Sequence, residues 1–157
     1  MDLQFILNHF SLLMLILALA LSATSWSGQV LCRYLLLFPV GVVGIFGFFL
    51  HAFAPVYAAE SVGWQASPFQ FEVAAANLGI GIAGITAFWK NWDFALAVTL
   101  IVFFFIMGGA YSHLLEVLFA EDYRPGNTGM IIYPDILIPL LLVLSLCFWK
   151  REISNEA

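Results

Sequence analysis

Hydrophobic residues form five long runs along this chain, and short polar segments separate the runs. The three middle runs are each long enough to cross a hydrocarbon core of about 30 Å as an α-helix, the first run is adequate and the last is short. The pattern therefore predicts an all-α, polytopic transmembrane helix bundle with five spans. The expected spans cover residues 5–21, 30–54, 69–89, 94–120 and 136–149.

Composition assigns the chain to the integral membrane proteins, which lie in contact with the lipid bilayer. Of its 157 residues, 63% are hydrophobic and 10% are charged, and the mean hydropathy is +1.00. This leaves too little polar surface to cover a soluble protein of the same length. The connections between runs are short, so residues 1–157 are expected to form one domain, and no nucleic-acid partner is expected.

The basic residues predict how the bundle is oriented in the membrane. Arg33, Lys90, Lys150 and Arg151 fall on one side of a five-span topology, and Arg124 falls on the other. Because basic residues concentrate in cytoplasmic segments, we expect the N-terminus outside and the C-terminus in the cytoplasm. The first run has no basic residue before it, so we interpret it as a retained helix. Cleavage of this run would leave four spans with the same sidedness.

All three histidines fall at the outer end of the predicted helices, together with most of the acidic residues. They are His9, His51 and His113. His51 follows Gly44 and Gly47 at spacings of three and four residues, which places its imidazole on a helix face of small residues. Such faces pack closely against other helices in membranes. We therefore expect His51 to point into the protein.

A second inward-facing group is predicted on the helix at 69–89. Glu72 shares one face of this helix with Ala76, Gly79 and Ala83, at the spacing of an interhelical seam. Gln70 stands where its side chain would reach back over the helix start as a capping box. We expect Glu72 to point into protein rather than into lipid.

The helix at 94–120 repeats this arrangement. Gly109, His113 and Glu116 lie on one face, and the step from His113 to Glu116 places the two side chains about one turn apart. Asp135 lies at the outer start of the last helix, where it would join the group. The predicted metal or cofactor site therefore consists of His51, Glu72, His113, Glu116 and Asp135.

Several chemistries fit two imidazoles and two or three carboxylates in a bundle of low dielectric constant. They suit a divalent metal ion, namely zinc, iron or manganese, and they also suit proton transfer between a histidine and a carboxylate. Only one His-x-x-Glu is present, in the reverse order of the motif in soluble di-iron bundles, so one metal ion fits better than two. Haem held by His51 and His113 is a weaker alternative, because no haem attachment motif is present.

The two outer loops carry aromatic and hydrogen-bonding residues that would cover the mouth of this site. A quinone or a lipid headgroup is the ligand that such loops would suit. Arg124 is expected to pair with Glu121 or Asp122, and the alternative is that it holds an anionic ligand over the pocket. The residues expected to line the pocket are Trp64, Gln70, Asn77, Tyr111, Tyr123 and Asn127.

Each polar residue of the predicted site also has an ordinary structural explanation. Glu72 and Asp135 stand near helix N-terminal ends, where acidic side chains are favourable. His51, His113 and Glu116 lie close enough to the membrane surface to reach water. However, an ionisable group at the bilayer centre costs roughly 2.5 to 3.5 kcal/mol, so several such groups on small-residue faces favour a shared polar pocket.

Several short motifs stand out between about Arg33 and Pro139. They are Gly63-Trp64, Ser67-Pro68-Phe69-Gln70, Glu72, Ala76-Asn77-Leu78, Pro125-Gly126-Asn127, Gly129, Asp135 and Pro139. In these motifs the chain resembles a family of small, uncharacterised bacterial inner-membrane proteins. The resemblance implies a multi-pass helical protein of the bacterial inner (plasma) membrane and no established activity. A looser similarity to DoxX-like four-helix proteins, some of which are linked to sulfur or quinone redox chemistry, rests on topology and the Glu-bearing third helix.

Three classes of function fit these observations, and the sequence leaves enzymatic activity open. The first is a membrane protein with a metal or redox cofactor in its outer pocket. The second is a non-catalytic accessory subunit, because glycine faces favour packing against another membrane protein or a second copy. The third is a small transporter or proton-coupled carrier. The cytoplasmic half has few buried polar groups, so the sequence predicts no continuous hydrophilic path.

Overall fold

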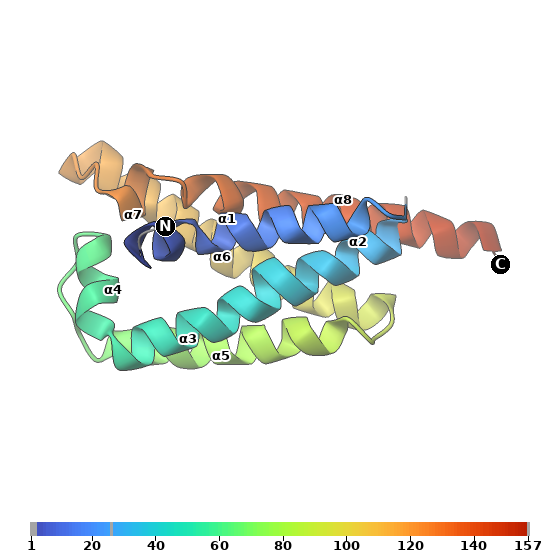
Figure 1. Cartoon of the computed structure of the whole chain (residues 1–157), viewed down its shortest axis with the longest axis horizontal. Helices are drawn as coiled ribbons and strands as arrows, with labels where there is room; N and C mark the ends of the chain where they lie inside the picture. The colour runs from blue at the N-terminus through green and yellow to red at the C-terminus, as the bar shows by residue number, and fades with distance from the viewer. Residues whose placement is uncertain (1–2, 26, 157) are drawn as a thin grey trace.

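The computed structural model describes residues 3–25 and 27–156, and the described secondary structure is helical throughout. The long helices run side by side, with α4 and α7 at one end of the bundle (Figure 1). The all-α class is therefore confirmed for the described residues. The elements are α1 (Leu3–Ser22), α2 (Gly28–Leu35), η1 (Leu36–Val42), α3 (Val43–Phe53), α4 (Pro55–Ser61), α5 (Phe69–Ala87), α6 (Trp92–Ala120), α7 (Pro125–Thr128) and α8 (Ile132–Glu156).

Four helical segments of the described chain are long and apolar enough to cross a membrane. They cover residues 28–53, 69–87, 92–120 and 126–156, and His9–Ser22 of α1 is a shorter apolar helix. The span predicted at residues 5–21, and with it the count of five, therefore stays a prediction, as does the membrane orientation. The last span is not short, since α8 runs from Ile132 to Glu156. The hydrophobic run underestimates its length because the helix continues through the charged residues that follow Trp149.

The second span contains a π-helical segment, η1, with Pro39 inside it. Proline has no backbone N–H and its ring obstructs the carbonyl one turn earlier, so a regular α-helix is disfavoured there. The wider π-helical turn accommodates the ring while the chain continues from α2 into α3. The hydrophobic pattern predicts this span but not its internal change of helix type.

α3 and α5 approach each other closely because glycines face one another. A Cβ atom added to Gly44 would lie 2.8 Å from Gly81 Cα, and one added to Gly81 would lie 2.8 Å from Ile45 N. A Cβ added to Gly84 would lie 2.7 Å from Leu36 O. The expected close packing of the glycine face that leads to His51 is therefore confirmed.

The small-residue face of α5 that includes Glu72 does not form the predicted seam. Glu72, Ala76 and Gly79 are exposed and Ala83 is half-buried, and a Cβ added to Gly79 would have nothing within 4 Å. The three small residues instead line an apolar groove of about 330 Å³ between α5 and α6. The prediction that Glu72 points into protein is wrong, because α5 carries small residues on more than one face and α3 packs on another.

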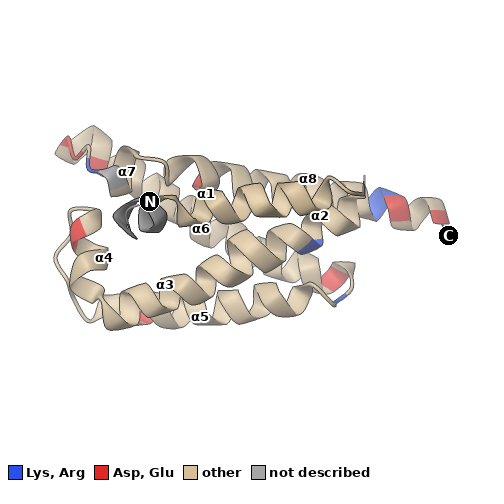
Figure 2. Ribbon diagram, viewed as in Figure 1, with Lys and Arg blue, Asp and Glu red and all other residues tan. Residues whose placement is uncertain are grey.

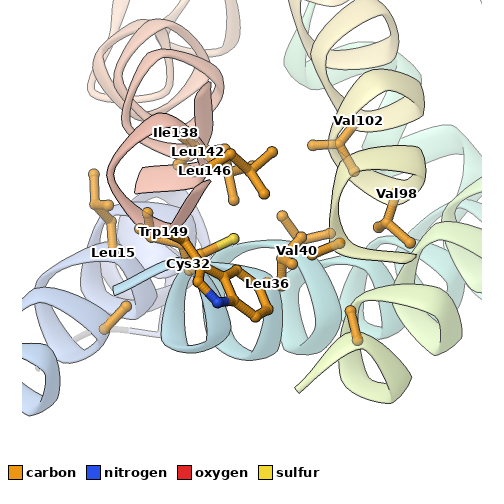
Figure 3. Close-up of a cluster of buried hydrophobic side chains, with 14 residues drawn as sticks. Leu15, Cys32, Leu36, Val40, Val98, Val102, Ile138, Leu142, Leu146 and Trp149 are labelled. Atoms are coloured by element: carbon orange, nitrogen blue, oxygen red, sulfur yellow. The ribbon is translucent and has the colours of Figure 1, made fainter. Parts of the chain in front are cut away.

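The hydrophobic core lies between α2, η1, α6 and α8 (Figure 3). Cys32, Leu36, Val102 and Leu142 are fully buried there, and Trp149 closes the cluster at 4% exposure. The outward faces of the helices are also apolar, as in a protein that contacts lipid.

Charged residues are concentrated at the two ends of the bundle (Figure 2). We call the end that carries Arg33, Lys90, Lys150 and Arg151 the basic end. The opposite end carries Arg124 together with α4, α7 and the segments 62–68 and 121–131, and we call it the loop end. The four basic residues of the basic end are thus separated from Arg124, as the sequence predicts.

Candidate functional site

A buried asparagine joins α6 to the loops of the loop end. The Asn127 side chain is fully buried, and its Oδ1 lies 3.0 Å from His113 Nδ1. Its Nδ2 donates to the backbone oxygens of Val62 at 3.1 Å and of Asp122 at 3.5 Å. One side chain therefore connects the segment after α4, the segment before α7, and α6.

These contacts assign the proton of the His113 imidazole. Because the amide nitrogen of Asn127 donates to two carbonyl oxygens, its Oδ1 faces His113 and accepts from Nδ1–H. The Trp64 ring stacks on the imidazole, with centroids 6.4 Å apart and an interplanar angle of 15°, and Trp64 Nε1 donates to Glu116 Oε1 at 3.0 Å.

We call Trp64, His113, Glu116 and Asn127 the loop clasp. The two turns around it need special backbone positions, since Gly63 has φ +84° and Glu121 has φ 52°. Gly126 packs so closely that an added Cβ would overlap the Ser61 carbonyl oxygen. The prediction that His113 and Glu116 share a helix face agrees with this arrangement, because Trp64 contacts both.

Arg124 lies beside the clasp and pairs with Asp122, at 3.7 Å between Arg124 Nε and Asp122 Oδ1. This is one of the two carboxylate partners expected from the sequence. The arginine side chain is 54% exposed, so the ion pair contributes little to stability.

Replacing Asn127 with alanine is expected to lower the free energy of unfolding by about 2 kcal/mol, because His113 and two backbone carbonyls lose their partner. Denaturant unfolding of the purified protein in detergent measures the change. Asn155→Ala removes an exposed asparagine near the end of α8 and should change stability by less than about 0.5 kcal/mol. Equal effects of the two substitutions would contradict a structural role for the clasp.

His51 contacts a different partner, Gln70 on α5. Its Nδ1 lies 2.6 Å from Gln70 Oε1, and the Gln70 side chain is 6% exposed. The predicted capping box is therefore wrong, since α5 has no side-chain cap at its N-cap, Pro68. Gln70 forms a contact between helices because His51 ends the glycine face that packs on α5.

The five predicted ligands do not form one metal site. Glu72 is exposed, and no three described His, Cys, Asp or Glu side chains lie close enough to hold one metal ion. Tyr111 and Tyr123 were expected to line the pocket, but they are 62% and 67% exposed. Metal or haem binding by the predicted residues stays a prediction, without support from their arrangement.

Asp135 lines a separate cavity of about 180 Å³ inside the bundle, which we call the Asp135 chamber. Asn77 and Ser11 supply its other polar side chains, and Gly109 and Phe105 are among the remaining residues. Among the residues that the structure describes, none forms a hydrogen bond or ion pair with the Asp135 carboxyl group. Sequence reasoning named Asp135 and Asn77 but missed Ser11, because α1 carries no motif that points to a site.

Asn77 is oriented by its own helix. Its Nδ2 donates to Val73 O at 2.9 Å, so its Oδ1 is the atom that remains to accept a hydrogen bond. The described polar groups of the chamber therefore offer acceptor oxygens from a carboxylate, an amide and a hydroxyl group, of which the hydroxyl can also donate.

The family of unknown function DUF6790 matches residues 2–155. The chain belongs to this family. DUF6790 therefore covers both the loop clasp and the Asp135 chamber, and the expected relation to a family without established activity is confirmed. No curated protein and no solved structure matches the chain. The looser similarity to DoxX-like proteins stays a prediction.

Proposed function

We propose that this protein is a membrane-embedded binding protein whose Asp135 chamber takes a small primary ammonium ion. The observation that carries the proposal is the Asp135 carboxyl group, which lies in a bundle cavity without a hydrogen-bond or ionic partner among the described residues. An ionisable group within a membrane span is costly unless a partner compensates its charge. A bound cation supplies that partner.

The acceptors of the chamber match the donors of a primary ammonium group. Such a group has three N–H donors, and Asp135, Asn77 and Ser11 offer one acceptor group each. Among the described residues that line the chamber there is no Lys, Arg or His to neutralise the carboxylate. Phe105 adds an aromatic ring for the cation. A volume of about 180 Å³ is similar to that of cavities of about 150 Å³ that hold benzene, so an amine with a few carbons fits.

The packing of the core supports a protein that binds the ammonium ion without transporting it across the membrane. The core between the chamber and the basic end contains Leu36, Val102 and Leu142, all fully buried. A carrier needs a polar path through this region. The metal-cofactor and accessory-subunit functions stay predictions, and elemental analysis and co-purification test them respectively.

The test is calorimetric titration of the full chain in detergent with methylammonium and propylammonium, in an amine-free buffer. Asp135→Asn should weaken binding at least about tenfold, because it removes the one carboxylate among the described residues of the chamber while keeping the side-chain size. Glu72→Gln is the matched control, since it removes an exposed carboxylate from the same end of the bundle and should leave the affinity unchanged.

Two results would overturn the proposal. One is the absence of binding by the wild-type protein at millimolar amine, and the other is an equal loss of affinity in both variants, which would indicate attraction by surface charge. A stoichiometric divalent metal that Asp135→Asn removes would support metal binding instead.

A further inference from the structure

The basic end contains a second pocket, which does not involve the Asp135 chamber. Its volume is about 460 Å³, and it lies between the start of α2, the connection from α5 to α6, and the end of α8. Three tryptophans, Trp89, Trp92 and Trp149, line it together with Arg33 and Lys90. Tryptophan and basic side chains together are typical of the headgroup region of a membrane.

Arg33 lies in this pocket with unused donors. Its Nε is buried without a hydrogen-bond partner, and no ion pair of Arg33 with a described residue is present. The guanidinium carbon lies 5.6 Å from the centroid of the Trp149 ring, which holds the group in place. The donors of the guanidinium group therefore lack an acceptor among the residues that the structure describes.

Glu152 also lines the pocket, but it forms no ion pair with Arg33, and its two oxygens are bound to the start of α2. Its Oε1 accepts from Gly28 N at 2.6 Å, and its Oε2 accepts from Ser27 Oγ at 3.0 Å and from Gln29 N at 3.3 Å. Glu156 is the other carboxylate in the lining. The pocket thus holds two cations without ion-pair partners and one carboxylate without a hydrogen-bond partner among the described residues.

We propose that this pocket binds the phosphodiester group of a phospholipid headgroup between Arg33 and Lys90. A planar guanidinium group matches the oxygens of a phosphate in geometry and charge, and a lysine adds a mobile donor. Glu156 in the lining disfavours a doubly charged phosphate monoester and favours the single charge of a diester. The tryptophans are suited to contact the glycerol region of a lipid.

Native mass spectrometry of the full chain in detergent tests the proposal with three probes: phosphatidylglycerol, diacylglycerol and inorganic phosphate. Phosphatidylglycerol should bind in preference to the other two. Arg33→Gln and Lys90→Gln should each weaken its binding about tenfold, because each removes a charge-assisted hydrogen bond. Arg151→Gln is the matched control, since Arg151 is exposed at the same end but does not line this pocket.

The outcomes separate the possible ligands. Equal binding of diacylglycerol and phosphatidylglycerol, or an equal effect of Arg151→Gln and Arg33→Gln, would overturn phosphate recognition in the pocket. If inorganic phosphate competes fully with the lipid, the ligand of the pocket is a free anion, and the proposal of a phospholipid is overturned. Lys90 is exposed in a connecting segment, so Lys90→Gln still tests the proposal if Arg33→Gln lowers the thermal stability.

Discussion

Replacing Gly81 with alanine is expected to lower the free energy of unfolding by about 3 kcal/mol, at the upper end of the range for overpacked interiors. The added Cβ would lie 2.8 Å from Ile45 N and 3.0 Å from Gly41 O. Both are backbone atoms of the second span, so no side-chain rotation relieves the clash and the helices must separate. Denaturant unfolding in detergent, followed by tryptophan fluorescence, measures the loss.

Gly79→Ala is the matched control for Gly81→Ala, because both positions lie on α5 two residues apart. A Cβ at Gly79 would have nothing within 4 Å, so alanine should be neutral or should stabilise the helix by about 0.5–1 kcal/mol through its higher helix propensity. A loss at Gly79 as large as that at Gly81 would mean that the face of Glu72 also packs against protein.

Replacing Glu152 with alanine is expected to lower the free energy of unfolding by about 3 kcal/mol, because three hydrogen bonds to a carboxylate disappear from the start of α2. The N-terminal amides of a helix carry a partial positive charge that a carboxylate stabilises. Without Glu152, Gly28 and Gln29 lose the acceptor that ties the second span to α8. Hydrogen exchange of the amides of α2 should then become faster, and denaturant unfolding should report the lower stability.

Glu156→Ala provides the comparison for Glu152→Ala. It removes the same charge one turn later on α8, where the side chain is exposed and forms no hydrogen bond with a described residue. Its effect should be below about 0.5 kcal/mol. If both substitutions had the same effect, the contribution of Glu152 would arise from the general charge of the basic end rather than from capping.

The two proposed binding sites depend on opposite charges at different places in the fold. Among the described residues, Asp135 has no cationic partner and Arg33 has no anionic partner. Both conclusions follow from unmatched charge rather than from clusters of histidine, which were the strongest signal in the sequence. His51 and His113 each contact a side-chain amide, so their observed role is to hold helices and loops together.

Part of the candidate site follows from local sequence. The three-residue step from His113 to Glu116 predicts a shared helix face, and Trp64 contacts both side chains. Gly44 and Gly47 before His51 predict a packed face, and that face meets α5. These predictions succeed because helix periodicity alone determines which nearby residues point the same way.

The sequence by itself determined the membrane class, the approximate helix ranges and the separation of charges between the two ends, because run length and composition control these properties. Only the tertiary structure decided which face of α5 packs, since small residues occupy more than one of its faces. It also decided the partner of Gln70, the cavity at Asp135 and the cap by Glu152, whose partner Gly28 is 124 positions away in the chain. Such contacts depend on how separate helices meet, and no local pattern encodes that geometry.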